Sequence, residues 1–158
     1  RSSDLIVEEI ALSVRDAIES TGINLIIDTN TEEKIIKCDR NEIERCIINL
    51  LSNASKFTPS GGTITVDIED LGEKVKITVE DTGIGIEEKY HKYIFDRFNQ
   101  IVDSSMETKG GSGLGLTITK HIIDMHNGEI YIESEVDKGT KFTIILPADG
   151  DIEKSIVI

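Results

Sequence analysis

The chain has 158 residues, of which 38% are hydrophobic and only 4% aromatic, a length that suits one domain able to bury its own core without a structural metal or disulfides. Its 30 acidic and 17 basic side chains give a net charge of −13, which argues against nucleic acid or an anionic membrane as partner, because those polyanions are bound by clustered lysine and arginine. Two cysteines without metal-ligand spacing, no long apolar stretch and no leader-like start favour a cytoplasmic chain without a disulfide framework.

The first half of the chain predicts two helices separated by two short strands. In order, the elements are a helix over about 4–20, strands over 23–27 and 34–38, and a helix over about 40–57. Asp39, with Glu42 three residues later, resembles a capping box at the start of the second helix. That helix should end at residues 58–62, Thr-Pro-Ser-Gly-Gly, which cannot continue it.

The second half predicts two hairpins and two further helices. In order, the elements are a hairpin of 64–68 with 75–79, a short helix over 87–93 followed by Ile94-Phe95 docked on the core, a helix over about 114–125 ended by Asn127-Gly128, and a hairpin of 130–132 with 142–146. Residues 96–113 show no period, and so long a loop in a compact domain is either functional or a sign of a wrong assignment. Together the elements predict an α/β fold, a two-layer sandwich in which helices cover one face of a mixed, mostly antiparallel sheet.

Asp81 is the most informative single residue. It continues the alternation of Val75, Ile77 and Val79 and should therefore point to the buried face, where a carboxylate is costly unless it accepts hydrogen bonds. Parity alone leaves open that the strand ends earlier and that Asp81 is a turn residue. Thr140 shares the parity of the apolar residues of the last strand, so a second polar group should lie on the same face. An Asp and a Thr there could recognise an amino group and a ring nitrogen of a planar base.

Three polar residues of the second helix, Asn49, Asn53 and Lys56, follow at i, i+4 and i+7 and so form one stripe beside the apolar face. Two neutral oxygen ligands and an ammonium suit a hydrated Mg²⁺ and the phosphates it carries, although the pattern by itself favours a solvated helix flank. Two glycine clusters lie at 81–85 and 110–115, and the second opens a helix, where free N–H groups favour an anion. Combined with the buried acid, these features indicate a nucleotide site between helices and sheet.

Four segments, in this order and spacing, resemble the motif boxes of sensor histidine kinases. They are the asparagine box NLLSNASKF at 49–57, the first glycine box DTGIGI at 81–86, the phenylalanine box FDRF at 95–98 and the second glycine box GLGL at 113–116. The resemblance covers residues 2–147 and implies a catalytic and ATP-binding domain of the Bergerat fold, which is shared with type II topoisomerases, mismatch-repair ATPases and heat-shock chaperone ATPases. It implies one domain over 1–147, whose first helix leads in from a dimerisation and phosphoacceptor domain absent from this chain, followed by a tail or linker start at 148–158.

The resemblance also implies a role for each matching residue. Asp81 would accept the adenine amino group, with Thr140 and a water completing the base contact, and Asn53 would hold Mg²⁺ with help from Asn49. The other residues implied for the ATP site are Phe57, Gly83, Gly85, Ile86, Lys109, Gly111, Gly113, Leu114, Gly115 and Leu116.

The implied catalytic set is Asn49, Lys56 and Arg97, of which the two cations would meet the phosphates beneath a mobile ATP lid formed by 96–113. No general base for the transfer is evident within the chain, since in the family that group lies beside the acceptor histidine.

The implied activity is that of a protein-histidine kinase. With ATP and Mg²⁺ as cofactors, the domain would donate the γ-phosphoryl group to a histidine on the absent dimerisation and phosphoacceptor domain, and a response regulator would be an indirect partner. His91, His121 and His126 all lack the sequence context of an acceptor. The chain alone is expected to be monomeric and free of membrane contact, whereas the parent protein is expected to be a homodimer that a membrane could anchor.

Two alternatives remain open on sequence grounds. One is a serine kinase of the anti-sigma type or a conformational ATPase with the same fold, although asparagines stand where a water-activating acid would be expected. The other is a non-enzymatic nucleotide-sensing or protein-binding module, which the intact boxes disfavour.

Overall fold

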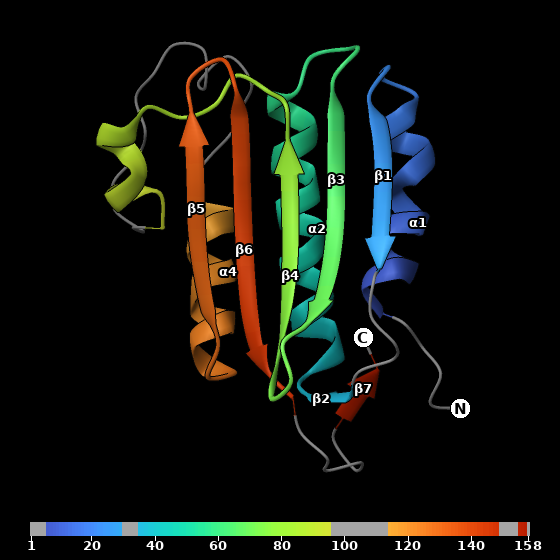
Figure 1. Ribbon diagram of the computed structural model, residues 1–158, viewed down its shortest axis with the longest axis vertical. Coiled ribbons are helices and arrows are strands. Elements are labelled where there is room, and N and C mark those ends of the chain that lie inside the picture. The colour runs from blue at the N-terminus through green and yellow to red at the C-terminus, as the bar shows by residue number, and fades with distance from the viewer. Residues whose placement is uncertain (1–5, 30–34, 96–113, 149–154, 158) are drawn as a thin grey trace.

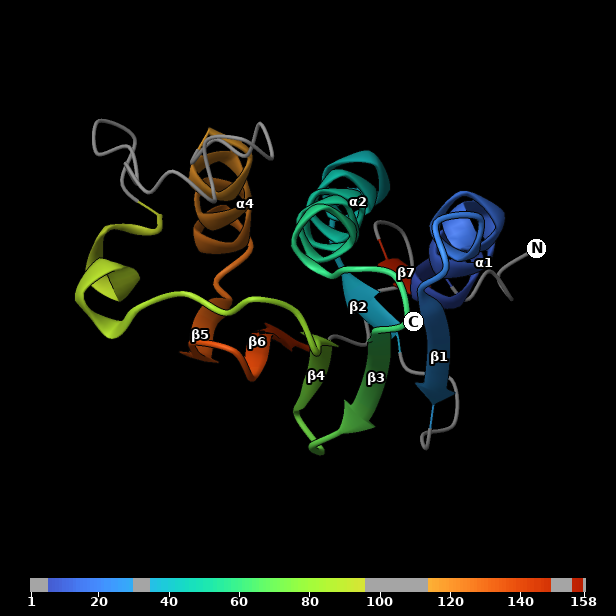
Figure 2. The same cartoon turned by 90° about the horizontal axis from the view of Figure 1, so that it is seen from above.

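The computed structural model describes residues 6–29, 35–95, 114–148 and 155–157, which fold into two layers (Figure 1). The helical layer contains α1 (Ile6–Glu19), α2 (Arg40–Phe57) and α4 (Leu114–Met125). The main sheet contains β1 (Asn24–Thr29), β3 (Thr63–Asp70), β4 (Lys74–Asp81), β5 (Glu129–Glu135) and β6 (Gly139–Pro147). Seen from above, the three helices lie side by side on one face of the sheet (Figure 2), as the sequence predicts.

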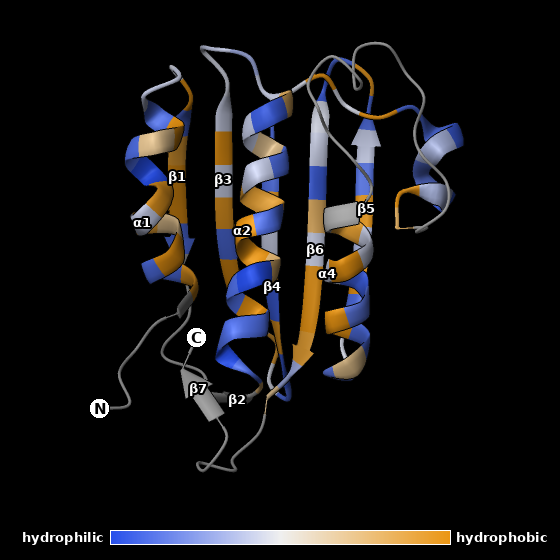
Figure 3. Ribbon diagram, turned by 180° about the vertical axis from the view of Figure 1, so that it is seen from behind, coloured by the Kyte–Doolittle hydropathy of each residue, from blue (hydrophilic) through white to orange (hydrophobic). Residues whose placement is uncertain are grey.

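The main sheet is mixed and mostly antiparallel. Its strand order is β1-β3-β4-β6-β5, in which β1 pairs with β3 in parallel and every other pair is antiparallel. Side chains alternate between its faces, so that Ile64, Val66 and Ile68 of β3 are buried beneath the helices while the residues between them are partly exposed. Figure 3 shows the corresponding alternation of hydrophobic and hydrophilic residues along the strands.

Helix α2 is the central element of the helical layer. Asp39 caps its start, since the Asp39 carboxylate accepts a hydrogen bond from the backbone N–H of Glu42 at 3.2 Å, and the helix ends before the sequence Thr58-Pro59 as predicted. One of its faces is completely covered by the sheet and the neighbouring helices: Ile43, Cys46, Ile47, Leu50, Leu51 and Ala54. Within the part of the chain that the structure describes, α2 and the other helices are too short or too polar to span a bilayer.

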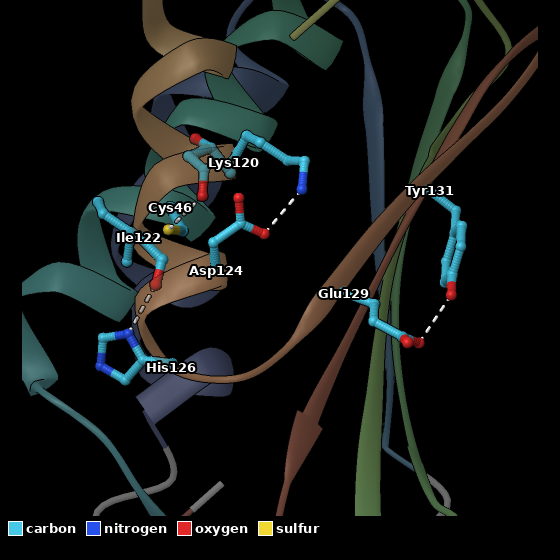
Figure 4. Close-up of polar contacts among 8 residues, drawn as sticks. Cys46, Lys120, Ile122, Asp124, His126, Glu129 and Tyr131 are labelled. Atoms are coloured by element: carbon cyan, nitrogen blue, oxygen red, sulfur yellow. Dashed lines mark hydrogen bonds and ion pairs between the residues drawn. The ribbon is translucent and has the colours of Figure 1, made fainter.

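The end of α4 is fastened to the start of α2 through His126. Nδ1 of this residue lies 2.8 Å from the carbonyl oxygen of Ile122, and Nε2 accepts the backbone N–H of Asp39 at 3.0 Å. Both contacts are satisfied together by a neutral imidazole that carries its proton on Nδ1. In Figure 4, His126 extends from the last turn of α4, and the Tyr131–Glu129 hydrogen bond lies beyond the helix on β5.

The short elements differ in part from the predictions. The predicted helix over 87–93 is a 3-10 helix, η1 (Glu88–Tyr93), and Ile94 after it is buried in the core as predicted. Strand β2 (Ile35–Lys37) does not join the main sheet but pairs antiparallel with β7 (Ser155–Val157). Residues 155–157 thus form a strand within the segment predicted as a tail or linker start, through pairing with residues far away in the sequence.

Candidate functional site

The centre of the site is Asp81, the last residue of β4. It lies directly opposite Thr140 of β6 in the antiparallel register, and only 6% of Asp81 and 7% of Thr140 is exposed. The Asp81 atom Oδ1 accepts the backbone N–H of Gly83 at 2.8 Å and that of Thr140 at 3.3 Å. Both bonds use the same oxygen, so Oδ2 is the atom available to a molecule in the pocket. The parity argument is thus confirmed, and Asp81 is a strand residue facing the core.

The protonation of Asp81 is shifted by its surroundings. Burial raises the pKa of the carboxyl group to about 6, the two backbone hydrogen bonds oppose this increase, and the nearby charge of Glu80 adds to it. Asp81 is therefore an ionised, acceptor-only group at pH 7 and above, and it becomes protonated in mildly acidic solution.

The loop after β4 is held in place by three hydrogen bonds, each donated by a backbone N–H group. Ile84 N–H donates to the carbonyl of Phe57 at 3.0 Å, Asp137 N–H donates to the carbonyl of Ile84 at 2.8 Å, and Ile86 N–H donates to Oγ of Ser134 at 2.7 Å. The loop is thus tied to the end of α2 on one side and to the β5–β6 hairpin on the other.

The two glycines of this loop are required by close backbone contacts. A Cβ on Gly83 would lie 2.2 Å from the carbonyl oxygen of Phe57, and a Cβ on Gly85 would lie 2.1 Å from that of Glu135. Gly85 also has a φ of +74°, which side chains rarely adopt. The first glycine box is therefore the sequence that lets this backbone pass between α2 and β5.

A pocket opens between α2, the glycine loop and β6. Its walls are mainly apolar, with polar groups from α2, β4 and β6; the lining residues are Asn53, Ala54, Phe57, Asp81, Gly85, Ile86, Ile94, Leu116, Thr140 and Phe142. Apolar walls around a few convergent polar groups are typical of a small-molecule site. These groups can receive a flat heterocycle that carries an amino group, because Oδ2 of an ionised Asp81 is able to accept an amino hydrogen.

The predicted stripe on α2 is only partly directed at this pocket. Asn53 lines it, whereas Asn49 donates from Nδ2 to the Thr119 hydroxyl of α4 at 3.4 Å, and Lys56 is exposed. The Asn53 amide oxygen is a neutral ligand of the kind that Mg²⁺ accepts alongside water, so its position at the pocket edge fits a nucleotide-bound metal. The roles predicted for Asn49 and Lys56 stay predictions.

The other predicted site residues fall into three groups. Phe57, Gly85, Ile86 and Leu116 line the pocket, and Gly83 contributes its N–H to Asp81. Leu114 and Gly115 begin α4, and their side chains are not described. Arg97, Lys109, Gly111 and Gly113, like the proposed lid over 96–113, lie outside the described residues.

Four further residues of the site were not predicted. Ala54, Ile94 and Phe142 line the pocket, and Ser134 binds the glycine loop and lies 2.8 Å from the Thr140 hydroxyl. A signal for Ser134 was present, because it shares the parity of the inward-facing Ile130 and Ile132. The apolar residues carry no signal that separates a pocket wall from the core behind it.

Comparison with known proteins agrees with this geometry. Residues 38–150 match the family described as histidine kinase-, DNA gyrase B-, and HSP90-like ATPases. The circadian input-output histidine kinase CikA of Synechococcus elongatus is 38% identical over 133 residues, 83% of this chain and 18% of CikA. The sensor histidine kinase WalK of Bacillus subtilis is 38% identical over 114 residues, 71% of this chain and 19% of WalK. The chain thus spans less than a fifth of the length of either relative.

Solved structures give the same result. A nucleotide-free catalytic domain of the histidine kinase ThkA has a TM-score of 0.78 and 30% identity, over 90% of this chain and 91% of that domain. A ThkA structure in complex with the response regulator TrrA has a TM-score of 0.77 and 27% identity, over 94% of this chain and 41% of the ThkA chain. The chain therefore belongs to the histidine kinase-, DNA gyrase B-, and HSP90-like ATPase family, and it is a catalytic and ATP-binding domain of a sensor histidine kinase.

Proposed function

We propose that this domain binds Mg²⁺·ATP in the pocket between α2 and β6 and donates the γ-phosphoryl group to a histidine on a separate dimerisation and phosphoacceptor domain. The observation that carries the proposal is the buried Asp81 opposite Thr140, a pair of buried polar groups in a mainly apolar pocket. Buried polar groups of this kind are costly unless a ligand or the protein satisfies them. Adenine has flat apolar faces that match the apolar walls of the pocket and an amino hydrogen that Asp81 can accept.

Each described residue has a distinct task in this proposal. Oδ2 of Asp81 accepts the adenine amino group, Phe142 and Ile86 exclude water from the base, and Asn53 holds Mg²⁺ with help from Asn49. When bound, the metal neutralises phosphate charge and orients the phosphates. Lys56 contributes positive charge from the neighbouring turn of α2, and Arg97 is assigned the same task.

The transfer itself is a displacement at the γ-phosphorus. A ring nitrogen of the acceptor histidine forms the new N–P bond while the bond to the β–γ bridging oxygen breaks, and ADP leaves with that electron pair. The group that takes the imidazole proton belongs to the acceptor domain. The ThkA–TrrA complex supports a response regulator as the later recipient of the phosphoryl group.

The chain alone is expected to bind ATP without labelling itself. Two of its three histidines have backbone contacts through the ring, His91 to the carbonyl of Ile86 at 3.0 Å and His126 at the end of α4, and phosphoryl transfer needs a nucleophile in line within about 3.5 Å. The measurement uses radiolabelled ATP with the chain alone, with an acceptor domain, and with an acceptor domain whose histidine is replaced. Acid-labile label on the chain alone, or no label on a cognate acceptor domain, would contradict the proposal.

The Asn53→Ala variant tests the metal assignment. If the Asn53 amide oxygen is a Mg²⁺ ligand, this variant should weaken ATP binding by roughly tenfold in Mg²⁺ and change it little in EDTA. Calorimetric titration under both conditions measures the difference, with Ser52→Ala, on the exposed side of the same helix, as the control. Equal losses with and without metal would mean that Asn53 only shapes the pocket.

The raised pKa of Asp81 predicts opposite effects of pH on binding and on stability. Protonation at a pKa of about 6 removes the acceptor for the adenine amino group, so ATP affinity should fall from pH 7 to pH 5. The folded-state pKa lies above the ordinary value of 3.8, so the folded domain binds this proton more tightly than the unfolded chain does. The nucleotide-free domain should therefore gain about 1 kcal/mol of stability from this group over the same interval. Urea unfolding of the wild type and of Asp81→Asn at both pH values measures this gain, because only the wild type carries the titrating carboxyl group. An equal change in the free energy of unfolding in the two proteins between pH 7 and pH 5 would contradict the prediction.

A further inference from the structure

Ser134 of β5 occupies a junction between three parts of the site. Its Oγ accepts the backbone N–H of Ile86 in the glycine loop at 2.7 Å, lies 3.0 Å from the carbonyl oxygen of Gly139, and lies 2.8 Å from Oγ1 of Thr140. Ser134 is also the cross-strand partner of Thr140 in the β5–β6 register. Oδ1 of Asp81 also joins the glycine loop to Thr140, but it accepts only the backbone N–H of the threonine, whereas Ser134 contacts the threonine hydroxyl.

Counting protons fixes the direction of these hydrogen bonds. A serine hydroxyl has one proton to donate and two lone pairs with which to accept. The Gly139 carbonyl can only accept, so it takes the proton of Ser134, and the Ile86 N–H takes one lone pair. The remaining lone pair faces Thr140, whose own proton must therefore point at Ser134. The arrangement leaves Ser134 with every bond that it can make.

This direction of the hydrogen bonds decides what the Thr140 hydroxyl can offer to a ligand. Since its only hydroxyl proton is directed at Ser134, Thr140 offers only lone pairs to the pocket that it lines. Asp81 beside it, when ionised, is likewise an acceptor only. Oδ2 of Asp81 and the hydroxyl oxygen of Thr140 are thus two acceptors at the base of the pocket, which suit the two hydrogens of an amino group at position 6 of a purine and oppose a carbonyl oxygen there. The contact of Thr140 with a ring nitrogen that the sequence suggests then requires a bridging water, because the adenine nitrogen beside the amino group is itself an acceptor.

We propose that Ser134 is a specificity-determining residue, which acts through Thr140 by holding the threonine hydroxyl as an acceptor and so selects 6-aminopurine over 6-oxopurine nucleotides. The inference rests on the proposed adenine site. Ser134 contacts neither the base nor the phosphates in this proposal. Its role is to orient the Thr140 hydroxyl, which differs from general support of the fold. Without Ser134 the Thr140 proton can turn toward the pocket and donate to the oxygen of a 6-oxopurine.

The test compares ATP with inosine triphosphate, which has the same ribose and phosphates but a 6-oxo group. Dissociation constants are measured by calorimetry in Mg²⁺ at pH 8, where Asp81 is ionised, for wild type, Ser134→Ala, Thr140→Val and the double variant. Ser134→Ala should reduce the preference for ATP by roughly two- to tenfold, the range of one hydrogen bond, chiefly by tightening inosine triphosphate binding. In the Thr140→Val background, removing the serine hydroxyl should leave the ratio unchanged.

Two further variants separate this role from a structural one. Ser134→Thr keeps the hydroxyl and should keep the wild-type preference for ATP over inosine triphosphate. Ser134→Cys fills the same space with a weaker hydrogen-bonding group and should lower that preference. It replaces Ser134→Ala as the test if the alanine variant does not fold. Ser13→Ala, which removes only a bond to the Ile10 carbonyl within α1, is the control and should change neither affinity. Equal weakening of both nucleotides in the serine variants, or an unchanged effect in the Thr140→Val background, would overturn the proposal. If the wild type binds neither nucleotide, both the proposed function and the proposed role of Ser134 are overturned.

Discussion

Replacing Asp81 by asparagine should lower ATP affinity by up to about a hundredfold while the domain stays folded. The asparagine oxygen can still accept the N–H groups of Gly83 and Thr140 that Oδ1 accepts now. The amide NH₂ then takes the place of Oδ2 and presents a donor to the donor on the base. The substitution also removes a buried charge whose pKa is raised by burial, so the free energy of unfolding at pH 8 should be unchanged or larger.

The control for this variant is Asp67→Asn. Asp67 lies on β3, on the face of the sheet away from the helices, and its pKa is also raised, first by desolvation and then by the charges of Asp28 and Glu69. It is no part of the pocket, so ATP affinity in Asp67→Asn should equal that of the wild type. Calorimetric titration with ATP and thermal unfolding of both variants give the comparison. An unchanged ATP affinity in Asp81→Asn would remove this residue from the site.

Gly85→Ala should cost about 2–5 kcal/mol of stability and abolish nucleotide binding in whatever fraction folds. An alanine at a left-handed φ costs about 1–2 kcal/mol, and overpacking typically adds about 1–3 kcal/mol. Both apply at Gly85, whose φ is +74° and whose added Cβ would meet the Glu135 carbonyl oxygen at 2.1 Å. That contact cannot relax unless the glycine loop moves away from β5, which would displace Ile86 from its bond to Ser134.

A matched control separates the two costs. Gly72, in the β3–β4 turn, has a φ of +88° but nothing within 4 Å of an added Cβ. Gly72→Ala should therefore lose only the stability that the left-handed backbone conformation costs. In urea unfolding, Gly85→Ala should therefore have a lower free energy of unfolding than Gly72→Ala, and only Gly85→Ala should lose ATP binding. Equal losses of stability would show that the contact with Glu135 relaxes freely.

The elements that could be predicted are those whose signals are local. Helix α2 was predicted to within a residue because a capping aspartate, a period of 3.6 and a Pro-Gly stop all agree. The inward direction of Asp81 followed from the period of two along β4, since a shift by one residue would expose the whole strand. The pairing of β1 in parallel with β3 had no such signal, because short apolar runs carry no information about their partners.

The polar contacts of the site were harder to predict than its residues. Asn49 was placed correctly beside the apolar face of α2, yet its bond to Thr119 depends on how α4 packs against α2. The bonds of Ser134 depend on three segments meeting at one hydroxyl. Periodicity gives the face on which a side chain lies, but the partner on that face is decided by packing between elements distant in sequence.

The pairing of β2 with β7 has a consequence for the time course of synthesis. Lys37 of β2 pairs with Ser155 of β7, so the ribosome must add 118 residues after one strand before the other exists, which at 5–20 residues per second takes roughly 6–24 s. The strands of the main sheet all precede β7 in the chain and can pair before it is made. During that interval β2 is an edge without its partner, open to pairing with another chain. Throughout that interval, β2 is thus a site in the growing polypeptide of this domain at which pairing with another chain is possible.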